Sequence, residues 1–266
     1  MAESAHRISP RTVLRITALN VRAQLEFRGE FALSIVHGVL WQTSLLLFLT
    51  VLVTRFPGLG GWTSGEVFFL AGLRLAGHAL YVLCFNTLTL LPKIVQEGRI
   101  EGYLLRPLPL LTQVLLSTAR ISALGDLAVG GTVLGISFGL VHTAWPPWKI
   151  AFLLVTLVGA ALLEGAVQLA ISVLAFGHVD TGTPSMWAEE VMGTFGNYPL
   201  GIFPTAVQVL LTTVFPAAYT AFLPAAVLLG HASGVAVLSP LAGFVAFWLA
   251  RRFWYARAAR YAGVGG

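Results

Sequence analysis

The sequence has little charge. Only 10% of its 266 residues are charged, whereas 57% are hydrophobic and the mean hydropathy is +0.83. Soluble domains carry about 25% charged residues, so this composition excludes an ordinary soluble protein and a disordered one. A spanning helix needs about 20 residues, so the length suits between about four and seven spans. We expect a single transmembrane domain over residues 1–266, with its function carried out in or at the bilayer.

Residues for metal, disulfide or nucleotide chemistry are also scarce. The one cysteine, Cys84, excludes an internal disulfide and a cysteine-rich metal site. The six histidines show no metal-site spacing. A phosphate-binding P-loop needs Gly-Lys followed by Ser or Thr, but Lys93 follows Pro92 and Lys149 follows Trp148. We therefore expect no catalytic residue, metal or cofactor in this chain, and a partner protein would have to bind ATP and magnesium.

One motif resembles the nucleophile elbow of serine hydrolases. Gly135, Ser137 and Gly139 fit G-x-S-x-G, but the elbow requires a strand-to-helix turn, and this motif falls in the middle of an apolar helical stretch. Gly131, Gly135 and Gly139 are spaced by four, which places them on one helix face where another helix can approach closely. Helix packing is therefore the favoured interpretation.

Apolar stretches predict an all-α membrane protein with six transmembrane helices. Four of them are residues 31–54, 67–91, 124–141 and 150–176, and residues 205–250 are long enough for two more. Residues 177–204 are polar enough to leave the core. Prolines interrupt the last stretch, which predicts broken or re-entrant helices before the last span.

The two ends of the chain are basic. At about 100° per residue, Arg11, Arg15 and Arg22 fall within an arc of about 40°, which predicts an amphipathic helix on the membrane surface within residues 1–30. A solvated basic tail is the alternative. Residues 31–250 would then form the six-span bundle, and residues 251–266 a cytoplasmic tail.

The positive charges predict the orientation. Six spans place both ends and the loop 93–107 on one side, which with Arg120 at a span entrance holds thirteen of the sixteen cations. The opposite loops hold Arg55 and Lys149, and Arg74 lies inside the second span. By the positive-inside rule both termini are expected in the cytoplasm, and the chain in the inner (plasma) membrane. The net charge of +5 therefore indicates topology, and we expect contacts with membrane lipids but not with nucleic acid.

Four polar residues within the spans are the first site candidates. Arg74 and His78 lie one turn apart in the second span, and Glu164 and Gln168 do so in the fourth. Each charged residue at a helix centre costs roughly 2.5–3.5 kcal/mol on insertion scales, so these side chains should face protein or water. They could line a substrate path, or form an inter-helix hydrogen bond or ion pair that fixes packing.

The loop 93–107, reading KIVQEGRIEGYLLRP, is the most charged short stretch of the chain. Alternating charge, two glycines and one tyrosine suit docking onto a soluble partner through exposed charge and an aromatic anchor. An ordinary solvated loop is the alternative. The residues expected to dock are Glu97, Gly98, Arg99, Glu101, Tyr103, Arg106 and Pro107.

Four segments together resemble the permeases of one branch of type-two ATP-binding-cassette (ABC) exporters, in which two related permeases accompany one separate ATPase. They are EGRIEGYLLRPL at residues 97–108, YPLGIFP at 198–204, FPAAYTAFLPA at 215–225 and RYAGVGG at 260–266.

The resemblance implies a six-span half-transporter that pairs with a related or identical permease and sits on two nucleotide-binding subunits. It makes the loop 93–107 the coupling surface, the amino-terminal segment an interfacial connecting helix, and residues 215–230 re-entrant helices toward the outer face. The substrate would be a lipophilic compound, drug or lipid.

Two alternatives remain open. The first is a membrane-embedded enzyme acting on lipid, for which Ser137, Glu164 or the histidines would have to serve. The second is an ion-driven secondary transporter, although the halves show no inverted repeat and the spans hold few titratable groups.

Overall fold

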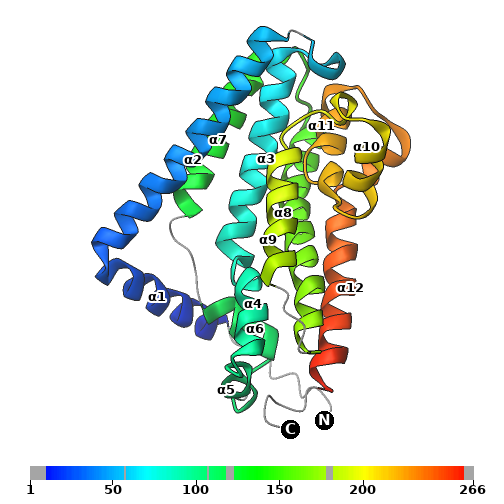
Figure 1. Ribbon diagram of the computed structural model, residues 1–266. Helices are drawn as coiled ribbons and strands as arrows, with labels where there is room; N and C mark the ends of the chain where they lie inside the picture. The colour runs from blue at the N-terminus through cyan, green and yellow to red at the C-terminus, as the bar shows by residue number, and fades with distance from the viewer. Residues whose placement is uncertain (1–9, 57, 107, 118–122, 178–181, 261–266) are drawn as a thin grey trace.

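The long apolar stretches become the longest helices. The computed structural model describes residues 10–56, 58–106, 108–117, 123–177 and 182–260, and every regular element within these ranges is a helix. The all-α expectation is thus confirmed. Four helices are long and apolar enough to span a membrane: α2 (Arg28–Arg55), α3 (Ser64–Phe85), α7 (Ala123–Leu140) and α8 (Pro147–Ala175). They rise together as the body of the molecule in Figure 1.

Shorter helices cover both ends of this bundle. At the lower end of Figure 1 lie α1 (Pro10–Glu26), α4 (Thr87–Gln96), α5 (Ile100–Leu104) and α6 (Leu110–Ser117). Helix α9 (Gly182–Phe195) runs beside α8. At the upper end lie α10 (Thr205–Thr213), α11 (Phe222–Leu229) and the 3-10 turns η1 (Leu59–Gly61), η2 (Leu200–Ile202), η3 (Ala217–Tyr219) and η4 (Gly234–Leu238). Helix α12 (Leu241–Ala258) descends along α8.

The expected count of six spans is not confirmed. Residues 205–213 and 217–229 form a pair of helices bent by 74°, which raises the count from four to five within the described residues. Pro216 lies at the bend, and proline cannot donate a helical hydrogen bond, so the interruption lies within the proline-rich stretch where broken helices are expected. Helix α12 is not among the helices that are long and apolar enough to span a membrane, and its lower half contains Arg251, Arg252 and Arg257.

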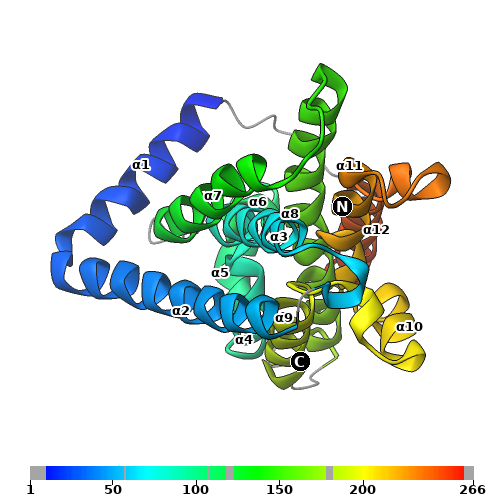
Figure 2. The same cartoon turned by 90° about the horizontal axis from the view of Figure 1, so that it is seen from above.

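Helix α3 is the centre of the core. In α3, 67% of an apolar stretch of 18 residues is buried inside the protein, whereas in α2 the corresponding share is 11%. It packs against α7 and α8, and in the view from above it lies between α2, α7 and α8 (Figure 2). Its start is fixed by a capping box, in which the Thr63 hydroxyl accepts from the Glu66 amide and the Glu66 carboxylate accepts from the Thr63 amide at 2.8 Å. The other Glu66 oxygen contacts His231 Nε2 at 2.8 Å, which ties this end to the chain after α11.

Two glycines allow α3 and α7 to approach closely. A Cβ on Gly72 would lie 2.7 Å from the Leu134 amide nitrogen, and one on Gly130 would lie 2.7 Å from that of Ala76. Only hydrogen fits at such distances, so these glycines set the spacing of the two helices.

The glycines expected to form a packing face of α7 are not the ones that contact α3; the contact is made by a residue one position earlier in the sequence. Gly131, Gly135 and Gly139 are exposed, and a Cβ on any of them would meet nothing within 4 Å. As a contact within this chain the prediction was wrong, because the residue that faces α3 is Gly130. A contact of this face with a second chain stays a prediction.

Ser137 does not form a nucleophile elbow. Its side chain is fully buried in α7, and its hydroxyl donates to the Leu134 carbonyl at 2.7 Å. A serine held in this way presents no nucleophile to a substrate, in agreement with the packing interpretation of the motif.

One boundary differs from expectation, and one polar segment folds as a packed helix. The second apolar stretch breaks at Asn86, and the next helix, α4, continues through Pro92. Burial of Pro92 together with Leu91 and Ile94 in the lower core offsets the hydrogen bond that proline lacks. Residues 177–204 were expected to leave the membrane core, which stays a prediction. The described residues 182–195 fold as α9 and pack against α4 and α8.

Helix α1 forms where the amphipathic helix was expected. It lies across the lower end of the bundle (Figure 1), contacts α2 and α6, and the Asn20 amide donates to the Leu116 carbonyl. Arg11, Arg15 and Arg22 are exposed. Its placement on a membrane surface stays a prediction.

The glycine register can be tested directly. Gly130→Ala puts a methyl group against the α3 backbone, and overpacking costs about 1–3 kcal/mol. We expect it to lower the midpoint of thermal unfolding in detergent by several degrees. Gly131→Ala is the matched control, because its methyl group meets open space and alanine is the better helix former. Equal midpoints for the two variants would contradict the packing described here.

Candidate functional site

A buried charge cluster joins the second and fourth long helices. Arg74 Nη1 donates to Glu164 Oε1 at 2.8 Å, and the Nδ1–H of His78 donates to Glu164 Oε2 at 2.7 Å. Arg74 is 2% exposed and Glu164 5% exposed. Both carboxylate oxygens therefore have partners, which is the condition under which a buried charge is tolerated. Three of the four polar residues expected within the spans thus come together.

The fourth residue, Gln168, has a different role. Its Nε2 donates to the Ser185 carbonyl at 3.0 Å, and Arg74 Nε donates to the Met192 carbonyl at 3.3 Å. Both acceptors belong to α9, so these two side chains fasten α9 to α8 and α3. The ion pair accounts for packing, whereas a role in lining a substrate path stays a prediction.

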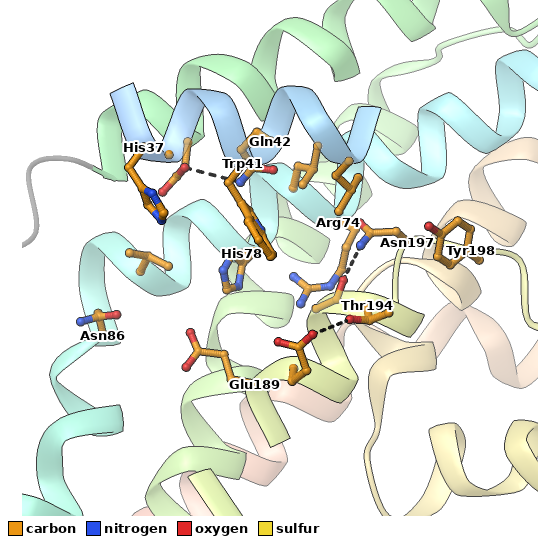
Figure 3. Close-up of a pocket in the computed structure, with 17 residues that line it drawn as sticks. His37, Trp41, Gln42, Arg74, His78, Asn86, Glu189, Thr194, Asn197 and Tyr198 are labelled. Atoms are coloured by element: carbon orange, nitrogen blue, oxygen red, sulfur yellow. Dashed lines mark hydrogen bonds between the residues drawn. The ribbon is translucent and has the colours of Figure 1, made fainter. Parts of the chain in front are cut away.

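A cavity of about 470 Å³ lies beside this cluster (Figure 3). Its walls come from α2, α3 and α9, with one residue of α7, and Arg74 and His78 line it. The volume is typical of ligand sites, which measure about 300–1,000 Å³. Figure 3 shows Trp41 directed toward His78 across the cavity. Tyr198 closes one end, and burial raises the pKa of its phenol, which therefore remains a hydrogen-bond donor.

Three carboxylates belong to the polar lining. Asp126, Glu189 and Glu190 all border the cavity. Glu190 accepts from the Thr194 hydroxyl at 3.2 Å. Asp126 Oδ1 lies 3.5 Å from Gln42 Nε2, a long hydrogen bond between α7 and α2.

Gly38 makes room for the Asp126 carboxylate. A Cβ at Gly38 would lie 2.9 Å from Asp126 Oδ1, so a larger residue would push the carboxylate or α2 away. The acidic wall of the cavity therefore depends on a glycine in the opposite helix.

Sequence reasoning missed these cavity residues. Asp126 could be recognised only as an interruption at the start of the third span, and Glu189 and Glu190 belong to the segment expected outside the core. The usable signal was the pair of adjacent glutamates that stands between apolar neighbours in the stretch MWAEEVM. Nothing in the sequence placed Trp41 opposite them.

The expected docking segment forms a short projecting helix. Helix α5 extends beyond the lower end of the bundle (Figure 1). It is preceded by Gly98, whose φ of 70° favours glycine. Glu97 contacts Arg99 at 2.9 Å and Lys93 at 3.8 Å. These exposed pairs arrange the charges but add little stability.

The most exposed apolar residue of this segment is Leu105, at 88%, whereas Tyr103 is half-buried against the lower core. Tyr103, the expected aromatic anchor, therefore packs partly against its own chain. The Arg106 guanidinium lies 5.6 Å from the centre of the Tyr103 ring. Gln113 Nε2 donates to the carbonyls of Tyr103 and Leu108, which holds the segment to α6. Pro107 lies outside the described residues.

The residues that a membrane-embedded enzyme would have to use are engaged within the chain or lie apart. Within the ranges that the structure describes, no three histidine, cysteine, aspartate or glutamate residues lie close enough to hold a metal ion. Glu164 is occupied by Arg74 and His78, and Ser137 is buried.

Comparison with known proteins points to one family. Residues 39–265 match the sequence model of a family described as ABC-2 family transporter protein. No curated protein and no solved structure matches the chain.

The charge cluster makes a clear stability prediction. Glu164→Leu leaves Arg74 buried without its partner, a change that costs about 3–5 kcal/mol. We expect a large fall in the thermal unfolding midpoint in detergent, and the double variant Arg74→Leu with Glu164→Leu should recover much of it. Lys93→Ala, which breaks an exposed pair, should change little. A double variant no more stable than Glu164→Leu alone would show that the pair is not the source of the loss.

Proposed function

The chain belongs to the ABC-2 family of transporter proteins, and on this premise we propose that it is the permease subunit of an ATP-driven exporter. In this proposal a separate ATPase supplies energy through residues 93–107, and a second permease, related or identical, completes the substrate path. The substrate is a lipophilic compound, drug or lipid. Proteins of this family are multi-pass membrane proteins that normally work with ABC ATPase subunits.

The observation that carries the proposal is the projection of α5 from the bundle. Glu101 on this helix and Leu105 directly after it are exposed, while Ile100 at the start of the helix is fully buried in the lower core. An exposed leucine among charges is a typical anchor for a partner surface. A partner bound there would hold the segment through its side chains and move the helices attached to it.

The connections of α5 suggest how such a movement spreads. Helix α5 contacts α6, α6 contacts α4, and α4 packs against α8 and α9. Ordered helices move as rigid elements when one end is displaced. Closure of the ATPases on ATP would therefore shift α4 and α9 together, and α9 is the wall that carries Glu189 and Glu190. The partner must bind more tightly in one nucleotide state for this coupling to work.

The chain offers lipid and a second permease a largely apolar surface. Only 11% of the apolar 18-residue stretch of α2 is buried inside the protein, and its Leu33, Leu40 and Leu47 are each more than 60% exposed. In a membrane these side chains would contact acyl chains or another subunit. The open face of Gly131, Gly135 and Gly139 is available for the same purpose.

We place both ends of the chain in the cytoplasm and the protein in the inner (plasma) membrane. Helix α1, helix α5 and the end of α12 lie at one end of the bundle (Figure 1). That end gathers most of the described arginines, whereas Arg55 and Lys149 lie at the ends of helices that reach the opposite side.

The coupling role predicts separable defects. Glu101→Arg or Arg106→Glu should uncouple ATP hydrolysis from export while leaving membrane insertion intact. Leu105→Asp should weaken ATPase association about tenfold or more, because anchor residues contribute about 2 kcal/mol or more. The measurements are ATPase co-purification and substrate-stimulated hydrolysis in proteoliposomes.

The control for this experiment is Val235→Asp, a charge placed at an equally exposed valine at the other end of the bundle. It should leave ATPase association unchanged. Normal export by all three coupling-segment variants would count against the proposed role.

The orientation has its own test. In a Cys84→Ser background, a cysteine at Glu101 should react with a membrane-impermeant maleimide only after the cells are opened. A cysteine at Val235 should react in intact cells. Labelling of position 101 from outside would place the docking segment on the wrong side for an ATPase and overturn the proposal.

A further inference from the structure

A second cavity, of about 440 Å³, lies at the lower end of the bundle between α1, α5 and α6. We call it the lower cavity. Its volume is within the range of about 300–1,000 Å³ that is typical of ligand sites. It shares no lining residue with the cavity beside Arg74, so a ligand bound here would leave that cavity open.

Two arginines carry the charge of its lining. Arg99 and Arg106 border the lower cavity, whereas Glu97 and Glu101, the acids nearest to them in the sequence, do not. Arg106 lies over the Tyr103 ring at 5.6 Å and forms no ion pair with a described residue. The Nε of Arg99 lies 2.9 Å from Glu97, but its two terminal nitrogens contact no acceptor within the described part of the chain. The net positive charge of the lining is therefore that of Arg106, and Arg99 adds directed donors.

These donors suit a phosphate group. A guanidinium forms two parallel hydrogen bonds to phosphate oxygens, and a phosphate has oxygens in several directions, so it can accept from both arginines at once. Tyr103 adds a hydroxyl to the same lining. Both arginines are exposed, so an anion reaches them without a rearrangement of the chain.

The walls of the lower cavity are held in place before any ligand binds. The Asn20 amide of α1 donates to the Leu116 carbonyl of α6. Gln113 of α6 donates to the carbonyls of Tyr103 and Leu108, at 3.0 and 2.7 Å. Helix α6 therefore fixes both α1 and the segment that follows α5. A preorganised site loses less conformational freedom when its ligand binds.

The position of α1 indicates where the anion comes from. Helix α1 ends at Glu26, and α2, which is long and apolar enough to span a membrane, begins at Arg28. In a membrane α1 would therefore lie at the level where the chain leaves the apolar layer. Leu14 and Leu19 on α1 are each more than 60% exposed, which is typical of a helix that rests on a lipid surface.

The lower cavity also has an apolar wall. It consists of Ile16 from α1 and of Leu108 and Leu116 from the region of α6. A soluble phosphoester has no group to place there, whereas a phospholipid carries acyl chains directly beside its phosphate. The combination of guanidinium donors with an aliphatic wall thus favours a lipid.

We propose that the lower cavity binds the phosphate headgroup of an anionic phospholipid. Basic pockets beside spanning helices are suited to such headgroups, because the negative charge of the lipid adds to the hydrogen bonds. A lipid bound here would contact α1 and residues 99–106 at the same time, and so hold the amino-terminal helix to the docking segment. The proposal goes beyond the exporter function and does not rest on it.

The test compares three probes on the purified full chain in an uncharged detergent, with bound molecules counted by native mass spectrometry. Dioctanoyl phosphatidylglycerol and dioctanoyl phosphatidylcholine have the same tails, but only the first has a net negative charge. We expect one molecule of the anionic lipid to bind at least about tenfold more tightly than the zwitterionic one. Glycerol 3-phosphate, which has the phosphate without the tails, should bind at least about tenfold more weakly than the anionic lipid.

Matched charge variants locate the site. The double variant Arg99→Gln, Arg106→Gln should weaken binding of the anionic lipid at least about tenfold. The control Arg15→Gln, Arg22→Gln removes the same number of charges from exposed positions of α1 that do not line the lower cavity. It should leave the affinity for the first bound lipid unchanged.

A third variant fills the lower cavity without changing its charge. Gly102 lines it, and a Cβ there would meet nothing within 4 Å, so a larger side chain fits without a clash at this atom. Gly102→Leu should therefore weaken binding of the anionic lipid about threefold or more. Unchanged elution on size exclusion shows that the variants remain folded.

The outcomes separate this inference from the exporter proposal. Equal binding of the two lipids, or equal loss in the two double variants, overturns the lipid site and leaves the exporter function standing. Glycerol 3-phosphate that binds as tightly as the anionic lipid shows a soluble phosphoester to be the ligand and overturns the lipid assignment. Loss of ATPase association in Arg99→Gln, Arg106→Gln with lipid binding retained assigns these arginines to the partner and also overturns it. Selective lipid binding by a chain that no ATPase accompanies supports the lipid site and removes the exporter function.

Discussion

The buried contact between Arg74 and Glu164 is the constraint on which the rest of the structure depends. Taking both charges out of water is costly, so each must keep its partners. Arg74 satisfies this condition by bonding to α8 through Glu164 and to α9 through the Met192 carbonyl. One side chain therefore fixes three helices relative to each other, and two of them, α3 and α9, form walls of the cavity.

The fold was largely predictable because apolar length determines where helices span. The four long helices follow the first four apolar stretches, and α3 and α8 bring Arg74, His78 and Glu164 together in an inter-helix ion pair, which is one of the two roles expected for them. The sequence could not set the rotation of α7, since Gly130 and Gly131 are equally good candidates for a close contact. Only the packing of Gly130 against Leu75 and Ala76 of α3 decides between them. Nor could it show that Gly182–Phe195 folds back beside α8.

The site was predictable only in part, for a related reason. A single charged residue within an apolar stretch is easily recognised in the sequence, so Arg74 and Glu164 could be found. A cavity, in contrast, is formed by residues from several helices. Asp126 on α7 and Glu189 on α9 are 63 positions apart, and their approach to one cavity follows from tertiary contacts that local pattern does not contain. In residues 93–107 the charge pattern indicated an exposed segment, but it could not show that Tyr103 is half-buried while Leu105 is exposed. Docking of this segment onto a partner stays a prediction.

The weak attachment of α2 determines how the cavity can be entered. This helix supplies His37, Trp41 and Gln42 to the cavity, yet few of its own apolar side chains are buried against the chain. Moving it outward breaks the long Gln42 to Asp126 contact and exposes little core. The free energy needed to move α2 outward is therefore set mainly by the lipid or protein that surrounds this helix. Of the cavity walls, α2 is therefore the one that can be displaced with the least loss of buried core.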